Sequence, residues 1–255
     1  MTGLFEPAPE ANILWMARVD STNEMAARLI RAMAEDEERL ADTVIVADMQ
    51  TEGRGREGNR WVSPAGGLYA TWLGWLPTAA LTWLPMAMGA ILAEAVELLV
   101  PTARVRLKWP NDLIAEGGKL GGILCQSRVS GESAWALAGF GVNIEGEAVL
   151  AATDATAPIS LRALGWRGTP DEARGGLVRA VISGLRPALA DSPRTREAWV
   201  RRSALAPGEL VRVRTGGTSV AGTLLGFGEE GQLLVEIDGA RVAIPAGELV
   251  TPLDG

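Results

Sequence analysis

The chain has 255 residues, of which 47% are apolar and 22% charged, the balance of a globular protein with one large domain and room for a small appendage. Its net charge of −7 argues against binding nucleic acid through broad electrostatic attraction. The absence of histidine and the single cysteine, Cys125, exclude a serine–histidine–aspartate triad, a cysteine–histidine dyad, a disulfide framework and a cysteine-rich zinc site.

Apolar and β-branched runs predict six strands in the first 145 residues, at 13–19, 43–48, 67–75, 104–109, 119–128 and 134–140. Helical spacing of apolar residues predicts two helices between them. One begins after Ser21, which stands three residues before Glu24 in a capping-box pattern, and reaches residue 33. The other covers residues 84–99. Pro110 should end regular pairing or place its strand at an edge, and the alternation predicts an α+β (α/β) fold.

Residues 61–93 contain no charge, which by hydropathy alone would suggest a membrane span. Pro64, Pro77 and Pro85 interrupt this run, and lipid does not tolerate the irregular backbone that they would impose. We therefore expect a soluble core and no membrane association. The N-terminus, MTGLFEPAPE, has no signal-peptide pattern, so we expect a cytoplasmic location.

Residues 171–190 and 194–204 are predicted to be helical, and the character of the chain changes at Pro207 and Gly208. Short runs separated by glycines and turn residues follow, at 210–214, 219–225, 232–237 and 241–244. Short strands at this spacing predict a small β-barrel. We place a boundary near residue 205, which gives predicted domains of 1–205 and 206–255.

The most distinctive segment is GRGREGNRW, at residues 53–61. Its three glycines allow the backbone to fold closely around a ligand, and its three arginines supply planar donors for phosphate and carboxylate. The alternative is a solvated hairpin tip. The segment fits the pattern G-x-G-x-x-G, but no helix follows, so it is not a dinucleotide-binding fingerprint.

Three further segments place polar residues beside proline or glycine next to predicted strands: KWPNDL (108–113), KLGGIL (119–124) and GFGVNI (139–144). Asn111 and Asp112 could bind a ribose, an amide or magnesium, or could cap their own turn. Lys119 could lie over a ligand that approaches the backbone at the glycine pair, or could be an ordinary surface lysine. GFGVNI could be a strand end with an asparagine turn. No segment decides the function alone.

In their order along the chain, GRGREGNRW, KWPNDL, KLGGIL and GFGVNI resemble the motifs of the biotin–protein ligases. The tripeptide STN at 21–23 and Gln50 fit the same pattern, as does the spacing from Asp112 to Lys119. The resemblance covers about residues 13–145 closely and the remainder loosely.

This resemblance implies a class II synthetase-like catalytic domain with a mixed central sheet and helices, followed by an SH3-like β-barrel. It implies an enzyme that condenses biotin with ATP, which brings Mg²⁺, to give biotinyl-5′-adenylate. The biotinyl group then passes to one lysine of a biotin carboxyl carrier protein or domain. Such a displacement requires positioning and charge neutralisation rather than a general base, in agreement with the absence of histidine.

The family also sets expectations about assembly. Homodimers are common in it, so a homodimer is possible here. The first strand begins near residue 12, which leaves no room for a helix-turn-helix before it, so we expect the monofunctional type, without a nucleic-acid partner. No metal site built from protein ligands is expected.

Each implied site residue occupies a position that matches a family motif. In the catalytic set, Lys119 stabilises the carboxylate oxygen and the α-phosphate, Arg56 retains the adenylate, and Asp112 orients or deprotonates the acceptor lysine. The residues implied to bind biotin are Ser21, Thr22, Gln50, Gly53, Arg54, Arg56, Tyr69, Lys119, Gly122 and Gly139. Those implied to bind the nucleotide are Arg54, Arg56, Trp61, Trp109, Asn111, Lys119 and Asn143. Glu57 and Asn59 depart from the pattern, because other members often carry more basic residues there.

Two alternatives share parts of this pattern. A lipoate–protein or octanoate–protein ligase or transferase would use the same fold, but GRGREGNRW and KWPNDL favour biotin. A non-catalytic biotin sensor would keep the pocket and lose the chemistry, and the retained Lys119 and Arg56 argue against it. The acidic net charge argues against a DNA-binding regulator.

Overall fold

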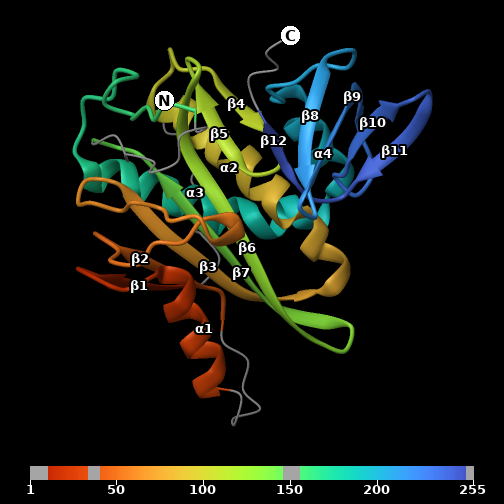
Figure 1. The fold of residues 1–255 in the computed structure, drawn as a ribbon. Coiled ribbons are helices and arrows are strands. Elements are labelled where there is room, and N and C mark those ends of the chain that lie inside the picture. The colour runs from red at the N-terminus through yellow and green to blue at the C-terminus, as the bar shows by residue number, and fades with distance from the viewer. Residues whose placement is uncertain (1–10, 34–40, 146–155, 251–255) are drawn as a thin grey trace.

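The computed structural model describes residues 11–33, 41–145 and 156–250, and two β-sheets organise them (Figure 1). The larger sheet has the strand order β1-β2-β3-β7-β6-β5-β4. Its strands are Asn12–Met16 (β1), Thr43–Ala47 (β2), Leu68–Pro77 (β3), Val105–Lys108 (β4), Asp112–Ala115 (β5), Gly118–Ser130 (β6) and Ser133–Val142 (β7). Strands β1 and β2 are parallel and all other neighbours are antiparallel, so the sheet is mixed, as the family resemblance implies.

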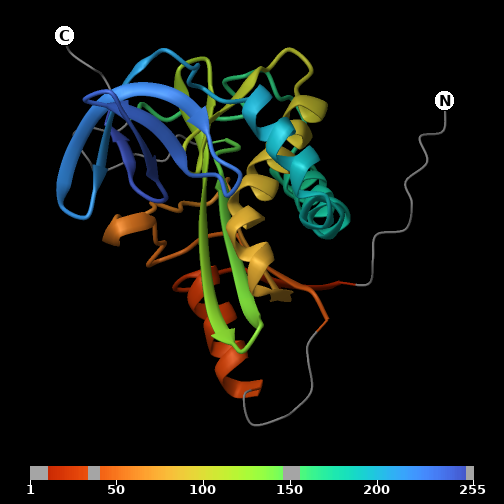
Figure 2. The same ribbon diagram turned by 90° about the vertical axis from the view of Figure 1, so that its right-hand side faces the viewer.

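Helices cover both faces of this sheet (Figures 1 and 2). They are α1 (Thr22–Met33), α2 (Leu84–Leu99), α3 (Pro170–Ala190) and α4 (Ser192–Arg201), and a 3₁₀ turn, Thr78–Trp83, precedes α2. Side chains of β2 alternate between the two faces. Ile45 packs with α1, while Val44 and Val46 belong to the main core with α2 and α3. Because both faces are covered, every residue of β2 is buried.

The smaller sheet is antiparallel throughout and has the order β11-β10-β9-β8-β12. Its strands are Leu210–Thr215 (β8), Thr218–Phe227 (β9), Leu233–Ile237 (β10), Ala240–Ile244 (β11) and Glu248–Val250 (β12). The ring of Phe227 packs edge-on against Trp199 of α4, with centroids 4.7 Å apart, and Arg196 donates a hydrogen bond to the Phe227 carbonyl. This sheet is therefore packed on the rest of the chain, and the boundary near residue 205 stays a prediction.

The structure corrects two expectations near the N-terminus. The predicted strand at 13–19 ends at Met16, and Val19 forms only an isolated bridge with Gln50. The predicted capping box at Ser21 is not formed, because the carboxylate of Glu24 pairs with Arg54 instead. A long-range partner thus replaces the local one.

Two short strands, β5 and β12, were not predicted. Strand β5 has four residues and β12 has three, so neither contains enough alternation to be distinguished from a turn. Pro110 lies in the turn between β4 and β5, and β4 is an edge strand, as expected.

Among the described residues one helical stretch, Thr78–Leu99, is long and apolar enough to cross a membrane by length and composition alone. Half of its most apolar window is buried inside the molecule. The buried side chains of α2 belong to the same core as those of the larger sheet and α3, which is how a core helix of this composition packs.

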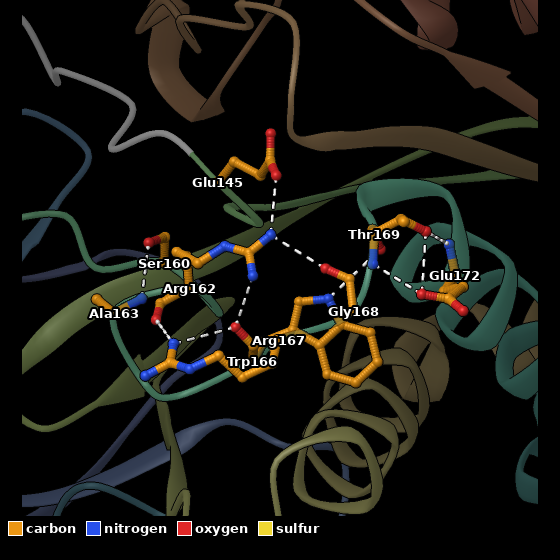
Figure 3. Close-up of polar contacts among 9 residues, drawn as sticks. All are labelled: Glu145, Ser160, Arg162, Ala163, Trp166, Arg167, Gly168, Thr169 and Glu172. Atoms are coloured by element: carbon orange, nitrogen blue, oxygen red, sulfur yellow. Dashed lines mark hydrogen bonds and ion pairs between the residues drawn. The ribbon is translucent and has the colours of Figure 1, made fainter.

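Arg162 fixes the segment 156–169, which connects the larger sheet to α3 (Figure 3). Its guanidinium donates to Glu145 Oε1 at 2.9 Å and to the carbonyls of Trp166 and Gly168 at 2.9 and 3.0 Å. Charge-assisted bonds to several acceptors hold irregular backbone in one conformation. A capping box between Thr169 and Glu172 then starts α3 (Figure 3).

Candidate active site

A cavity of about 500 Å³ lies among β5, β6, β7, the start of α1, the loop 53–61 and two strands of the smaller sheet. All but two of the predicted site residues line it: Ser21, Thr22, Gln50, Arg54, Arg56, Trp61, Tyr69, Trp109, Asn111, Asp112, Lys119, Gly122 and Gly139. The two exceptions are Gly53 and Asn143. Segments far apart in the sequence therefore meet around one space.

Lys119 and Asp112 form an ion pair in the cavity wall, with Nζ and Oδ1 2.7 Å apart. The two side chains are 18% and 19% exposed, so solvent screens the pair only partly. A register shift between Leu113 and Ile114 in the β5–β6 pairing re-aims side chains here. Among the described residues no other donor reaches Asp112 Oδ1, so this oxygen depends on Lys119. An anionic substrate can compete for this lysine.

Lys108 adds a second lysine to this cluster. It lies directly opposite Asp112 in the β4–β5 pairing and lines the same cavity. Burial, as the main cause, lowers the pKa of Lys108. Lys119 lowers the pKa further, while Asp112 and Glu248 oppose the shift. The cluster thus places two lysines and two carboxylates, Asp112 and Glu248, close together in the cavity wall.

The two arginines at the start of the loop have different partners. Arg54 is exposed and pairs with Glu24 of α1, so its charge is already neutralised. Arg56 is half-buried and donates to the carbonyl of Gly247 at 2.9 Å and, more weakly, to Asn111 Oδ1 at 3.4 Å. Neither acceptor carries a charge. The Arg56 guanidinium is therefore the loop cation better placed to bind an anion in the cavity.

The loop forms a hairpin, with an isolated antiparallel bridge between Arg54 and Arg60 and an exposed tip at residues 57–60. The Gly55 N–H donates to the Asn59 carbonyl at 2.7 Å, and Arg60 donates to the Thr51 carbonyl at 3.1 Å. Glu57 adopts a left-handed conformation, with φ 53°, which is uncommon for a residue other than glycine. Such strained positions concentrate at ligand-binding loops.

Uncharged hydrogen-bonding groups gather at the other end of the cavity. Gln50 Oε1 accepts from the Thr22 N–H at 2.8 Å, and Gln50 Nε2 donates to Ser63 Oγ at 2.8 Å. Gly53 stands behind them, where a Cβ would collide with the Trp61 carbonyl and lie 2.9 Å from Gln50 Nε2. Gly53 therefore shapes this end without lining it.

Strand β6 relates the two ends. Lys119 lies at one end, and the Leu124 carbonyl, five residues along, accepts from Asn23 beside Thr22 at the other. The backbone of β6 spans about 16 Å between Lys119 and Leu124, since each residue of a strand adds about 3.3 Å. The site thus suits an elongated ligand with an uncharged polar head and an anionic, reactive tail.

Asn143 lies behind Lys119 and is buried. Its Nδ2 donates to the carbonyls of Lys119 and Ile159 at 3.2 and 3.1 Å, and the Lys119 N–H donates to the Ala157 carbonyl at 2.7 Å. The segment that Arg162 anchors therefore holds the backbone of Lys119. Both amide protons of Asn143 are therefore used to hold the backbone behind Lys119, and Asn143 does not line the cavity.

Tyr69 is buried in β3, and its hydroxyl donates to the Pro64 carbonyl at 2.8 Å. Burial, opposed in part by Arg174, raises the pKa of Tyr69 to about 12.

A Tyr69→Phe variant should show how much this burial contributes. In the unfolded chain the Tyr69 hydroxyl ionises near its ordinary pKa, whereas in the folded protein it stays neutral to a higher pH. The free energy of unfolding therefore falls as pH rises from the ordinary pKa toward about 12. Wild type should lose about 2 kcal/mol by pH 11.5, whereas the variant loses only the hydrogen bond, about 1 kcal/mol at any pH. Urea unfolding should therefore show wild type as the more stable protein at pH 8 and Tyr69→Phe as the more stable at pH 11.5. The same order at both pH values would contradict the raised pKa of Tyr69.

Several cavity residues lay outside the predicted set. Asn23 and Lys108 belong to the quoted motifs, STN and KWPNDL, so their signal was present and not used. Arg214 and Glu248 come from β8 and β12, where they pair with each other, and no local pattern marks them. Trp109 shows the same dependence on the smaller sheet, because its Nε1 donates to the Gly231 carbonyl at 3.0 Å.

Among residues 11–33, 41–145 and 156–250, no group of three or more aspartate, glutamate, cysteine or histidine side chains could hold a metal ion. A divalent cation entering this cavity would therefore depend on phosphate oxygens of a substrate for most of its ligands.

Comparison with known proteins gives a consistent relationship. The family model described as the biotin/lipoate A/B protein ligase family matches residues 15–143. The biotin–[acetyl-CoA-carboxylase] ligase of Paracoccus denitrificans is 34% identical over 251 residues, covering 92% of this chain and 98% of that protein. The corresponding ligase of Mycobacterium tuberculosis is 31% identical, and the alignment covers 92% of this chain and 87% of that protein. The Aquifex aeolicus biotin protein ligase solved with biotin and ATP aligns with a TM-score of 0.73 at 28% identity, covering 93% and 97%.

Proposed function

The chain belongs to the biotin/lipoate A/B protein ligase family, and from this premise we propose that it is a biotin–protein ligase that acts through the cavity described above. It forms biotinyl-5′-adenylate from biotin and ATP and transfers biotin to a lysine of a biotin carboxyl carrier protein. The observation that carries this assignment is the juxtaposition of Lys119 and Arg56 with the uncharged pocket at Thr22 and Gln50.

The first step is an in-line displacement. A carboxylate oxygen of biotin attacks the α-phosphorus of MgATP, an O–P bond forms, and pyrophosphate leaves. Lys119 exchanges its contact with Asp112 for the reacting carboxylate and α-phosphate, where negative charge is concentrated. Arg56 neutralises the phosphate from the loop side. Preorganised cations in a partly water-excluded site make a general base unnecessary.

In the second step the amine of the acceptor lysine attacks the acyl carbon, and AMP leaves. Asp112, released from Lys119, is the carboxylate available to orient this amine or to accept its proton. Trp61 and Trp109, with Asn111 and Asn143, are proposed to surround the nucleotide. Tyr69, Gly122 and Gly139 are proposed to line the biotin pocket.

Further properties are proposed from the family and from the sequence. Residues 206–255 are proposed to form a separate SH3-like domain, supported by the antiparallel order of β8–β12. The protein is proposed to act in the cytoplasm, without nucleic-acid or membrane partners, and to be able to form a homodimer. Limited proteolysis tests the boundary near residue 205, and the mass in solution tests the dimer.

Thermal unfolding with biotin or lipoate should separate the two acids that the family uses. At 100 times its Kd, biotin should stabilise the protein by about 2.7 kcal/mol, which raises Tm by about 5 to 11 °C for a chain of this length. Lipoate should give no shift. Pyrophosphate release on addition of biotin and MgATP then distinguishes an enzyme from a sensor. A response to lipoate alone would overturn the proposed function.

A further inference from the structure

A chain of buried polar side chains lies beneath the uncharged end of the cavity. Thr22 and Asn23, at the start of α1, are each 4% exposed and line the cavity. Thr71, in β3, is completely buried and does not line it. Thr71 Oγ1 lies 2.6 Å from Asn23 Oδ1 and 2.8 Å from Thr22 Oγ1. A buried hydroxyl between two side chains that face a ligand can control what those side chains offer to it.

The orientation of the Asn23 amide is fixed by its other partners. The Leu124 carbonyl can only accept, so the Asn23 atom 3.2 Å from it must be Nδ2. The second Nδ2 proton goes to Gln126 Oε1 at 2.9 Å, which leaves Oδ1 directed at Thr71. Gly139 makes room for this arrangement, because a Cβ there would collide with Asn23 Oδ1.

Counting protons then fixes the direction of the chain. Asn23 Oδ1 can only accept, so the single hydroxyl proton of Thr71 goes to it. The contact between Thr71 and Thr22 must therefore use the proton of Thr22. Gln50 Oε1 is a poorer acceptor for that proton, because it is 3.2 Å away and already accepts the Thr22 N–H. Thr22 Oγ1 is left with only lone pairs to present to the cavity.

We propose that Thr71 is a positioning residue that fixes the Thr22 hydroxyl as a hydrogen-bond acceptor, so that the pocket selects a ligand head carrying an N–H. The inference rests on the proposed function, and it identifies the N–H of the ligand head as the group that the pocket recognises. The ureido ring of biotin carries two N–H groups, whereas the dithiolane ring of lipoate carries none. A site built to bond a polar ligand group rejects an analogue that lacks it, because its own buried polar groups are left unpaired.

The test is a comparison of Thr71→Val with Thr71→Ser. Valine keeps the shape and removes the hydroxyl, so Thr71 no longer holds the Thr22 proton, which can turn toward Gln50 Oε1 or toward the ligand. The KM for biotin in pyrophosphate release should rise about tenfold, equivalent to about 1.4 kcal/mol, with kcat within about twofold. Serine keeps the hydroxyl and should restore a wild-type KM. Desthiobiotin, which retains the ureido ring, should show the same pattern.

Thr195→Val is the matched control. Thr195 is also buried, and its hydroxyl donates to the Ala188 carbonyl at a distance of 2.6 Å. Neither residue lines the cavity. It should lower Tm as Thr71→Val does and leave KM unchanged. If Thr71→Val does not fold, Thr71→Ala makes the same comparison. A KM for Thr71→Val equal to that of Thr71→Ser, or an equal rise in Thr195→Val, would overturn the inference. Failure of the wild type to use biotin would instead overturn the proposed function.

Discussion

The Lys119→Ala variant is expected to bind biotin within about threefold of wild type and to form the adenylate at least 100-fold more slowly. Biotin affinity should depend mainly on the uncharged end at Thr22 and Gln50, because Lys119 is paired with Asp112 in the free protein. A preorganised donor at the reacting atoms is worth about 3 to 4 kcal/mol in the transition state, which corresponds to a rate effect of 100-fold or more. Calorimetry with biotin and single-turnover pyrophosphate release measure the two quantities separately.

The ion pair with Asp112 complicates this variant and also supplies its control. Removing Lys119 leaves a partly buried carboxylate without its partner, which costs stability and adds negative charge beside the attacking carboxylate. The double variant Lys119→Met with Asp112→Asn removes both charges and should recover stability without recovering adenylate formation. If it restored the rate, Lys119 would act only by neutralising Asp112. Normal adenylate yield from Lys119→Ala would show that its assignment is wrong.

The sequence was most informative where function depends on local segments. The glycine–arginine loop, KWPNDL and KLGGIL stand out in the sequence, and the family resemblance that they carry names most of the residues that meet around the cavity. The mixed sheet and the order of helices followed from periodicity and from the family resemblance.

The remainder depends on contacts between distant residues. Arg56 donates a hydrogen bond to the carbonyl of Gly247, 191 residues away in the sequence. Glu24 pairs with Arg54 instead of forming the capping box that the sequence predicts. The direction of the hydroxyl at Thr71 depends on a carbonyl of β6 that no local pattern identifies. Pairings of this separation are decided by tertiary packing, which overrides local preference.

The Arg56→Ala variant should release biotinyl-5′-adenylate at least tenfold faster than wild type, whereas Arg54→Ala should stay within about threefold. Both arginines belong to the same loop and both line the cavity, so the pair is a matched comparison. Arg54 is exposed and neutralised by Glu24, while Arg56 is half-buried with only uncharged acceptors at Gly247 and Asn111. A charge-assisted hydrogen bond to phosphate is worth about 1.5 to 3 kcal/mol, which corresponds to 10-fold to more than 100-fold in dissociation.

Loss of Arg56 also removes the contact between the loop and the smaller sheet, so the loop should open more often. Preloading each variant with labelled adenylate, removing free ligand and following its release measures dissociation directly. Biotinylation of a bystander protein in the same solution reports the escaped adenylate, because the free mixed anhydride acylates exposed lysines without an enzyme. Wild type and Arg54→Ala should label the bystander slowly, and Arg56→Ala rapidly. The opposite ranking, in which Arg54→Ala releases adenylate and Arg56→Ala retains it, would contradict this assignment. It would mean that Arg54 leaves Glu24 when the ligand binds. The pairing of the arginines in the free protein would then not decide which one holds the phosphate.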